Sequence, residues 1–471
     1  MTQTAPTAMP RRAFLRHVFL TGAAAGAGPL LSACFDGGRP GGAAAAPGSG
    51  PTPAPSLPPG PAAGGGQLSI PSGPLAGIGP LQAANADELL LPEGFSSRIV
   101  AQNSSASLAA ISSTGYAWHP FPDGGATYAR DNGGWIYTSN SEVLLVDGLG
   151  GCGALVFDPD GSIVDAYSIL TGTAMNCAGG KTPWGTWLSC EETGSGMTWE
   201  CDPYNPGQGI AKPALGLFAH EAAVVDLENR TLYQTEDTGD GRFYRWVADP
   251  ADFDAANGRL AMEQGRLQVM NIAGFEDGGD TADATEQLRT LHPVTWVDAL
   301  APDQPQSSNR GPGTIFDGGE GCWFYELPPA VRTVPEGGSR PTKGLVFFST
   351  KGDNRVWAYD IENALVELIF DNSQIDPAFS DVDNITVSPR GDILVAEDNP
   401  DTGAIRIMVL IPNQPSKVLV QLSLRHTGSE ICGPAFSPDG SRLYFSSQRG
   451  PDFFGAPTGT TFEVTIPEAF R

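Results

Sequence analysis

The chain has 471 residues, of which 53 are Asp or Glu and 27 are Lys or Arg, and its formal net charge is −26 at pH 7. Such an acidic excess argues against nucleic acid and anionic lipid as partners. It is compatible with binding of hard divalent cations, provided that the acidic side chains cluster in the fold.

The first 33 residues are predicted to be an export signal. Two arginines in "RRAFLR" precede a Gly/Ala-rich apolar run that is too short to span a bilayer stably, which is typical of a twin-arginine signal. The run ends in "LSAC", which resembles the lipobox of bacterial lipoproteins and predicts lipidation of Cys34. We therefore expect a periplasmic or cell-surface protein whose only membrane contact is a lipid anchor. A plain signal peptide with a coincidental cysteine is the alternative.

Residues 34–85 are predicted to be a disordered tether. They are rich in Gly, Pro, Ala and Ser and contain few large apolar side chains. Burial of so little apolar surface does not offset the entropy lost on ordering the chain. Residues 86–471 contain no second linker, and we expect them to form one large domain built from repeats.

From about residue 90 onward, short alternating strands are joined by tight turns. Asp-Gly and related pairs between β-rich runs are the strongest short-range hairpin signal. Residues 281–291 are the best helix candidate. These features predict an all-β chain, and recurring similar hairpins favour a single β-propeller, although their irregular spacing does not give the number of blades. The hairpin turns are expected at Asp160-Gly161, Glu228-Asn229, Gly352-Asp353, Arg390-Gly391 and Asp439-Gly440.

The acidic residues cluster at the ends of these predicted strands. In a propeller, equivalent strand ends converge on the central channel, where carboxylates repel one another unless cations neutralise them. Taken singly, each acidic pair is more typical of a solvated rim. Oxygen ligands suit calcium, whereas a thiolate from Cys177 suits iron or zinc. The clustered positions are Glu191-Glu192, His220-Glu221, Glu236-Asp237, Glu320, Asp383-Asn384 and Glu397-Asp398.

The stretch "NCAGGKTPWGTWLSCEE" does not form a phosphate-binding loop. The position that needs the first glycine of that motif is Met175, and Pro183 follows where a helix should begin. The cysteines leave one further option, because Cys190 and Cys201 could close a short disulfide loop in an oxidising compartment. The pairing of the cysteines does not follow from the sequence.

Five segments, taken in order, resemble the PhoX-type alkaline phosphatase family. The resemblance extends from about "GGWIYTSNSE" to the carboxyl terminus, and the first two segments are long and specific. It implies a six-bladed β-propeller with an iron and calcium cluster in its channel, which hydrolyses small phosphoesters without a side-chain nucleophile. The segments are "NCAGGKTPWGTWLSCEET", "HEAAVVDLENRTLYQTEDTGDGRFYRW", "GLVFFSTKGDNRVWAYD", "DNITVSPRGDILVAEDNP" and "GPAFSPDGSRLYFSSQRG".

The resemblance also implies metal ligands. The iron-binding cysteine of the N-C-A-G-G stretch maps onto Cys177, the second glutamate of C-E-E onto Glu192, and the glutamate of H-E-A-A onto Glu221. Further metal carboxylates are expected at Glu236 or Asp237 and at Glu320. No catalytic side chain and no oligomeric state are predicted.

One departure bears on activity. Active family members carry an arginine two positions before the glutamate that maps to Glu320, and Gly318 occupies that position here. A guanidinium there would bind phosphate through two hydrogen bonds. The sequence therefore predicts a metal-dependent phosphoester hydrolase with weak turnover. The alternatives are a non-catalytic surface propeller that binds a ligand or partner, and a calcium-dependent lactonase-like hydrolase.

Overall fold

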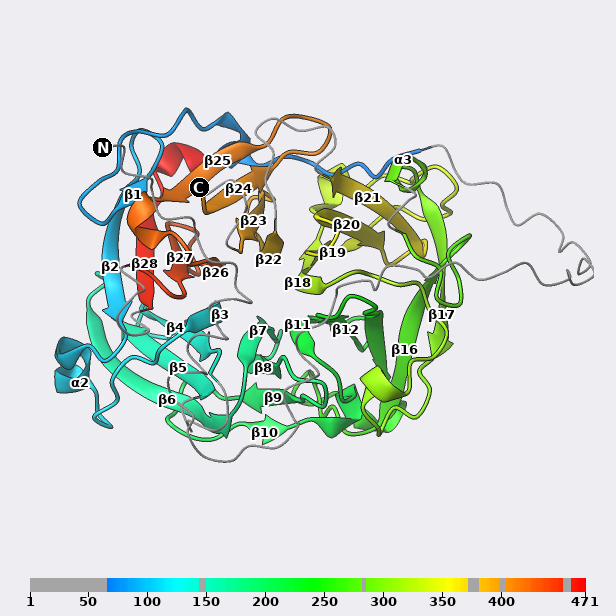
Figure 1. The fold of residues 1–471 in the computed structure, drawn as a ribbon, viewed down its shortest axis with the longest axis horizontal. Helices are drawn as coiled ribbons and strands as arrows, with labels where there is room; N and C mark the ends of the chain where they lie inside the picture. Colours follow the sequence, from blue (N-terminus) through cyan, green and yellow to red (C-terminus); the bar gives the residue numbers. More distant parts are fainter. Residues whose placement is uncertain (1–65, 144–149, 282–284, 372–380, 399–403, 452–458) are drawn as a thin grey trace, which may run out of the picture.

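The computed structural model describes residues 66–143, 150–281, 285–371, 381–398, 404–451 and 459–471. Within these ranges the chain folds into antiparallel four-stranded meanders that follow one another around a common centre (Figure 1). The prediction of an all-β propeller is confirmed. Cys34 and the signal lie outside the described residues. None of the described helices is long and apolar enough for a membrane crossing.

The first three meanders occupy residues 122–298. The first consists of β3 (Pro122–Ala129), β4 (Trp135–Ser141), β5 (Gly150–Phe157) and β6 (Ile163–Thr173). The second consists of β7 (Asn176–Lys181), β8 (Trp187–Glu191), β9 (Thr198–Cys201) and β10 (Ile210–Ala211). The third consists of β11 (His220–Asp226), β12 (Thr231–Glu236), β13 (Phe243–Ala248) and β16 (Gly265–Ile272), with β17 (His292–Asp298) added at its edge.

The remaining meanders follow the same plan. The fourth consists of β18 (Gly319–Glu326), β19 (Gly344–Thr350), β20 (Arg355–Asp360) and β21 (Leu365–Asp371), and β17 also pairs with β21. The fifth consists of β22 (Val382–Val387), β23 (Ile393–Glu397), β24 (Arg406–Leu410) and β25 (Lys417–Leu422). The sixth described meander contains β26 (Ile431–Phe436), β27 (Arg442–Ser447) and β28 (Thr460–Thr465).

Short elements fill the connections. In the described residues, two α-helices, α2 (Ala106–Ile111) and α3 (Thr285–Leu288), and a small hairpin of β14 (Phe253–Asp254) and β15 (Arg259–Leu260) lie outside the meanders. The helix expected over residues 281–291 is thus limited to α3 in the described part. The 3-10 helices are η1 (Pro74–Gly77), η3 (Pro213–Leu215), η4 (Pro250–Asp252), η5 (Gln306–Ser308), η6 (Pro329–Val331), η7 (Leu424–His426) and η8 (Glu468–Phe470).

Two N-terminal strands join the last two meanders, one as a fifth strand of the fifth meander and one as the fourth strand of the sixth. β1 (Leu89–Leu90) pairs with β25, and β2 (Ser96–Gln102) pairs with β28 (Figure 1). The innermost strands β3, β7, β11, β18, β22 and β26 each contact the next, and β26 contacts β3. The ring is therefore closed by strands from opposite ends of the chain.

The folded part begins earlier than residue 85, the predicted end of the tether. Leu75 and Ile78 are buried in a cluster with side chains of the fifth and sixth meanders. The backbone N–H of Leu75 also donates to Asp392 Oδ1 at 2.9 Å. A few buried apolar side chains and hydrogen bonds to later meanders therefore order a Gly/Pro-rich segment whose composition alone predicts disorder.

All five predicted hairpin turns are confirmed. Each joins consecutive strands of one meander, as β5 to β6 around Gly161 and β26 to β27 around Gly440. Both glycines have positive φ, +85° and +71°, which other residues rarely adopt. The turn chemistry in the sequence thus sets the hairpins that build each meander.

Apolar side chains fill the space between neighbouring meanders. Phe243 of β13 stacks on Phe348 of β19 with ring centroids 4.1 Å apart, and Phe348 stacks on Trp357 of β20 at 5.9 Å. The option of a Cys190–Cys201 disulfide is wrong, because both are free thiols. In the pairing of β8 with β9, Cys190 lies opposite Thr198 and Cys201 lies opposite Trp187. The two cysteine side chains lie in different apolar clusters.

Candidate metal centre

Each innermost strand carries a β-bulge shortly after it begins. The strand pairing shifts by one residue between Pro122 and Gly125 in β3, and equivalent shifts occur in the other five. Neighbouring inner strands approach closely at these bulges. A Cβ on Gly124 would lie 2.5 Å from Ala178 Cα, and one on Gly321 would lie 2.3 Å from Ile385 N. Small residues after the bulge therefore let six strands converge on a narrow channel.

The bulges place one donor side chain from each inner strand in the channel. In each inner strand, this donor is the residue directly after the first residue that pairs with the second strand of the same meander. We call these residues the inner ring, and all of them are buried. The inner ring comprises Asp123, Cys177, Glu221, Glu320, Asp383 and Cys432.

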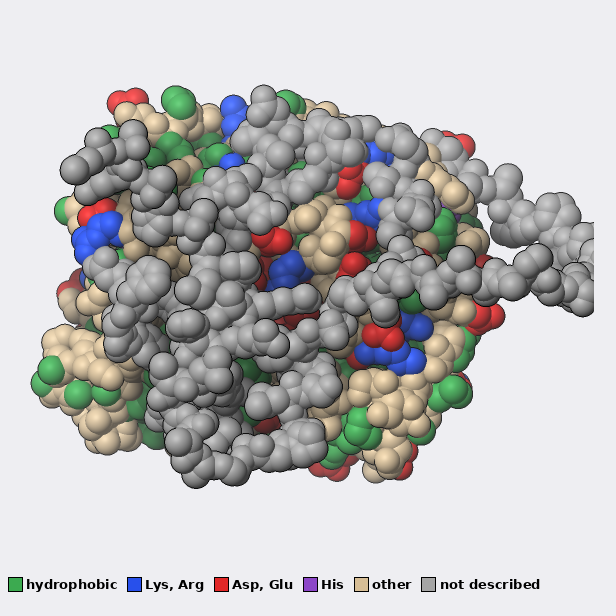
Figure 2. All heavy atoms as spheres, in the orientation of Figure 1, with side chains coloured by type: hydrophobic (Ala, Val, Ile, Leu, Met, Phe, Trp, Pro, Cys, Tyr) green, Lys and Arg blue, Asp and Glu red, His purple; other side chains and the backbone are tan. Residues whose placement is uncertain are grey.

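A second ring is formed by the residues that directly follow the second strand of each meander. Its members are polar and lie against the inner ring: Gln448 Nε2, for example, donates to Asp123 Oδ2 at 2.6 Å. Figure 2 shows acidic and basic side chains gathered near the centre of the face in view. The second ring comprises Glu142, Glu192, Asp237, Lys351, Asp398 and Gln448.

Residues of the two rings, together with Glu430 directly before β26, form five overlapping groups of three donors whose ligand atoms lie within 4.8 Å of one another. Two groups include Cys177, one includes Cys432, and two contain only carboxylates. They are Asp123–Glu142–Cys177, Cys177–Glu192–Glu221, Glu221–Glu320–Asp383, Asp383–Asp398–Glu430 and Asp123–Glu430–Cys432.

Glu221 lies at the centre of this arrangement. Its side chain is fully buried, and among the described residues neither carboxylate oxygen has a hydrogen-bond partner. Burial, reinforced by Glu320 and Asp383, raises the pKa of Glu221 well above its ordinary value. Leaving a buried carboxylate without a partner is costly, and a cation held by several carboxylates would remove that cost.

The thiol of Cys177 lies in the same electrostatic environment. Burial and the negative charges of Asp123 and Glu221 raise its pKa well above the ordinary value of a cysteine. A bound cation would reverse this effect, because a metal ion favours the deprotonated thiolate.

Two basic side chains also lie among the acids. Burial acts to lower the pKa of Lys351, but Glu320, Asp237 and Asp398 raise it well above its ordinary value. The ammonium of Lys351 forms an ion pair with Glu320 and lies 3.4 Å from Asp398 Oδ2. Arg449 lies on the other side of Asp398 and binds Glu430 Oε1 at 2.7 Å.

The six metal ligands expected from the sequence occupy different environments. Cys177, Glu192 and Glu221 form one donor group, and Glu320 lies in the next. Asp237 lies at the rim, where its Oδ2 is 3.9 Å from Lys351 Nζ.

Glu236 belongs to none of the donor groups in the described residues. Its Oε2 accepts from Arg310 at 2.7 Å, from the hydroxyl of Tyr244 at 3.0 Å and from the backbone N–H of Arg242. Of the neighbouring pair, Asp237 is the member of the second ring, although it too belongs to none of the donor groups in the described residues.

Several donors were not expected from the sequence. Asp123, Glu142, Glu430 and Cys432 lie outside the acidic pairs at the predicted strand ends, and for Asp383 and Asp398 the sequence predicts only membership of an acidic cluster. The sequence contains a weak signal for the inner-ring donors, because most of them are followed by one or two small residues. The stretches are "DGG", "CAG", "EAA", "EG" and "CG".

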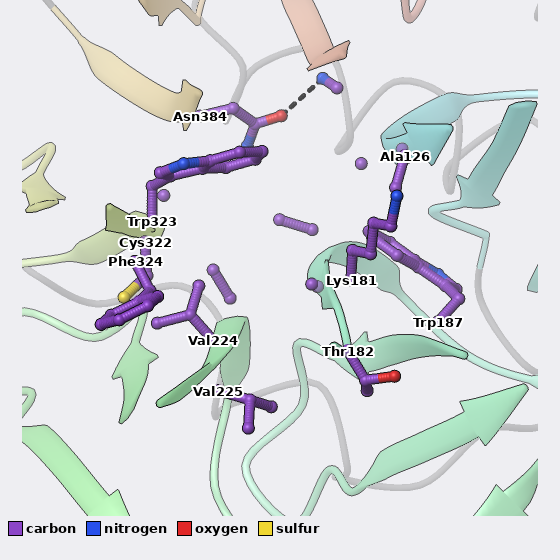
Figure 3. Close-up of a pocket in the computed structure, with 18 of the residues that line it drawn as sticks. Ala126, Lys181, Thr182, Trp187, Val224, Val225, Cys322, Trp323, Phe324 and Asn384 are labelled. Atoms are coloured by element: carbon purple, nitrogen blue, oxygen red, sulfur yellow. Dashed lines mark hydrogen bonds between the residues drawn. The ribbon is translucent and has the colours of Figure 1, made fainter. Parts of the chain in front are cut away.

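Beyond the bulges, the same six inner strands line a cavity of about 440 Å³. Figure 3 shows Trp323 and Asn384 on one wall, with Lys181 and Trp187 across the cavity from them. Val224 and Phe324 contribute further apolar surface. This cavity contains none of the inner-ring donors among its lining residues in the described chain.

Comparison with known proteins agrees with this geometry. The sequence profile of the alkaline phosphatase PhoX family matches residues 159–200, 194–323 and 331–450. The solved structure of Pseudomonas fluorescens PhoX in complex with vanadate, a transition-state analogue, superimposes with a TM-score of 0.60 at 15% identity. That match covers 83% of this chain and 98% of the other, and supports the propeller fold.

A gluconolactonase from Xanthomonas campestris aligns with a TM-score of 0.41 at 12% identity, over 87% of this chain and 99% of the other. No curated protein sequence matches the chain directly.

Proposed function

The chain belongs to the alkaline phosphatase PhoX family, and from that premise we propose that it hydrolyses small phosphoesters at a metal centre formed by the two rings. The observation that supports a metal most directly is Glu221, a buried carboxylate with no hydrogen-bond partner in the described chain and with four donor residues around it. Carboxylates that converge in this way fit a cluster of cations better than a single ion.

The donor groups differ in the ions that they fit. Glu221, Glu320 and Asp383 offer only oxygen and suit a hard cation such as calcium. Cys177 adds sulfur to two groups, which suits iron or another transition metal. When bound, such ions would polarise the phosphate oxygens and offset the charge of the transition state.

The side chains of the protein would position the phosphate. Lys351 is the cation of the second ring, its side chain is 20% exposed, and its ammonium reaches the acidic inner ring. We propose that Lys351 donates to a phosphate oxygen of the substrate while Asp237 and Asp398 orient the ammonium. A preorganised donor of this kind stabilises developing charge at little reorganisation cost.

Gly318 is compatible with this role for Lys351. The backbone N–H of Lys351 donates to Gly318 O at 2.7 Å, so the two residues are adjacent in space. Gly318 has φ +67°, and a Cβ there would lie 3.2 Å from Asp237 Oδ1 and from Gly352 N. An arginine at this position would be strained. We therefore propose that Lys351, rather than a residue at 318, supplies the phosphate-binding charge, and that turnover is weak.

A phosphoester assay with metal analysis tests the function. The exported, purified protein should contain metal and hydrolyse p-nitrophenyl phosphate, and chelation should abolish the activity until calcium and iron are returned. Chelation should also lower the melting temperature by several degrees, because bound ions stabilise only the folded state. Activity that persists in chelator would contradict metal dependence. Activity on lactones without activity on phosphoesters would support the alternative hydrolase.

We also propose that the protein is exported by the twin-arginine route and anchored through Cys34. Residues 1–65 lie outside the described part, so this rests on the sequence. Replacing Arg11 and Arg12 by lysine should retain the precursor in the cytoplasm, and Cys34→Ala should release a soluble product. Membrane retention of the Cys34→Ala protein in a fractionation experiment would rule out the anchor.

A further inference from the structure

The six described cysteines fall into two classes. Cys152, Cys190, Cys201 and Cys322 each pack within an apolar cluster between the meanders. Cys177 and Cys432 belong to no such cluster among the described residues, and both stand on the inner ring. Cys432 therefore occupies the position in the sixth meander that Cys177 occupies in the second.

Asp123 lies between these two cysteines in the ring. Its carboxylate contributes to the donor group with Glu142 and Cys177, and to the group with Glu430 and Cys432. Its Oδ1 accepts from the backbone N–H of Gly124 at 2.6 Å, and its Oδ2 accepts from Gln448 at 2.6 Å. These bonds fix the orientation of a carboxylate that both cysteine groups share.

Gln448 provides an independent indication of a ligand. Its side chain is 1% exposed, and its Nε2 donates to both Asp123 Oδ2 and Glu142 Oε2 at 2.6 Å. The other polar atom of the same amide, Oε1, has no hydrogen-bond partner in the described chain. A buried amide oxygen without a partner is costly, and the Nε2 of the same amide contacts the shared carboxylate.

We propose that Cys432, Asp123 and Glu430 form a second thiolate-bearing metal site, on the opposite side of Asp123 from Cys177. The inference rests on the proposed metal centre and adds a second position for a transition-metal ion. Arg449 holds Glu430 Oε1 and orients that carboxylate. When the ion binds, the Cys432 thiol loses its proton to solvent as the sulfur–metal bond forms. A mixed sulfur and oxygen donor set selects an ion of the iron or zinc class over calcium.

The test compares metal binding by four forms of the full chain: the wild type, Cys432→Ser, Cys177→Ser and Cys322→Ser. Cys322 is the matched control, because it is buried in an apolar cluster. Elemental analysis of the purified proteins gives the transition-metal content. After chelation and titration with Co²⁺, the thiolate-to-cobalt absorption band reports the number of cobalt–sulfur bonds.

Each inner-ring variant should lose about half of the absorption band and about one transition-metal ion per chain, because one of two thiolate ligands is lost. Cys322→Ser should match the wild type. A Cys432→Ser protein with the full band and metal content would overturn the second site while leaving the proposed function intact. Absence of metal from the wild type would instead overturn the metal centre as a whole.

If Cys432→Ser does not fold, X-ray absorption on the wild type decides the question. Sulfur neighbours at both of two transition-metal ions support the inference, and sulfur at only one of them overturns it.

Discussion

The two ends of the central channel are made by the same six strands but differ completely in chemistry. At the bulges the strands present carboxylates and two thiols, whereas beyond the bulges they line an apolar cavity. On β11 the change occurs within three residues. Glu221 is a buried carboxylate without a partner in the described chain, and Val224 lies on the cavity wall.

This difference shows that the propeller fold alone does not determine where a reactive centre lies. Ring closure brings equivalent positions of all six strands together at every level of the channel. In the described chain, every group of three donors includes residues of the inner ring, so the charge on which the proposed metal centre rests is gathered at this end of the channel. Variants at each end should therefore have separable effects.

The largest effect is expected for Glu221→Gln at the acidic end. The change keeps the shape of the side chain but removes a charge shared by two donor groups. We expect kcat/KM to fall by more than about a hundredfold, since even residues that only support metal ligands reach that cost. Metal content should fall, and the difference in melting temperature with and without chelator should shrink.

Glu367→Gln is the matched control, because Glu367 is a buried glutamate on β21 that accepts from the backbone N–H of Leu68. It should leave metal content unchanged. Burial raises the pKa of Glu367 to about 7, so the wild type loses stability as pH rises from about 4.5 to 7. The Glu367→Gln variant should not lose stability over this pH range, and at pH 8 it should have a higher melting temperature than the wild type. Equal metal loss in both variants would show that Glu221 has no special role.

An intermediate effect is expected for Lys351→Met. Removing the ammonium should lower kcat/KM for phosphomonoesters by about a hundredfold, the usual cost of losing one preorganised donor. Metal content should persist, and inhibition by inorganic phosphate should weaken. Lys343→Met is the control, since Lys343 pairs with Glu228 away from both rings. An unchanged inhibition constant for phosphate would show that Lys351 does not bind the substrate.

The smallest effect on function is expected at the apolar end. Val224→Ala removes two buried carbon atoms and should cost about 1–2 kcal/mol of unfolding free energy. Metal content and kcat/KM should stay within about twofold of wild type. A denaturation curve and an elemental analysis are sufficient to check this. Loss of metal in Val224→Ala would mean that the two ends of the channel are coupled.

The sequence predicted the parts of this fold that depend on local chemistry. Turn pairs such as Asp160-Gly161 specified the hairpins, because few residues other than glycine adopt positive φ. The resemblance to a family indicated Cys177, Glu192 and Glu221, which the structure brings into one donor group.

What the sequence did not predict depends on contacts between distant segments. Asp123 and Cys432 meet only because the ring closes, and nothing local to either residue indicates the other. Glu236 and Asp237 are adjacent in sequence, and only the structure shows that the first is bound by Arg310. Residues 66–85 are ordered by docking on later meanders, which composition does not show.

The closure of the ring by β2 on β28 also has a consequence for biosynthesis. Asp123 is synthesised long before Glu430 and Cys432, so their shared donor group cannot form until the sixth meander has been made. Contacts of such long sequence separation form late and slowly in folding. An ion held by these three residues would therefore bind only after the first and sixth meanders have come together.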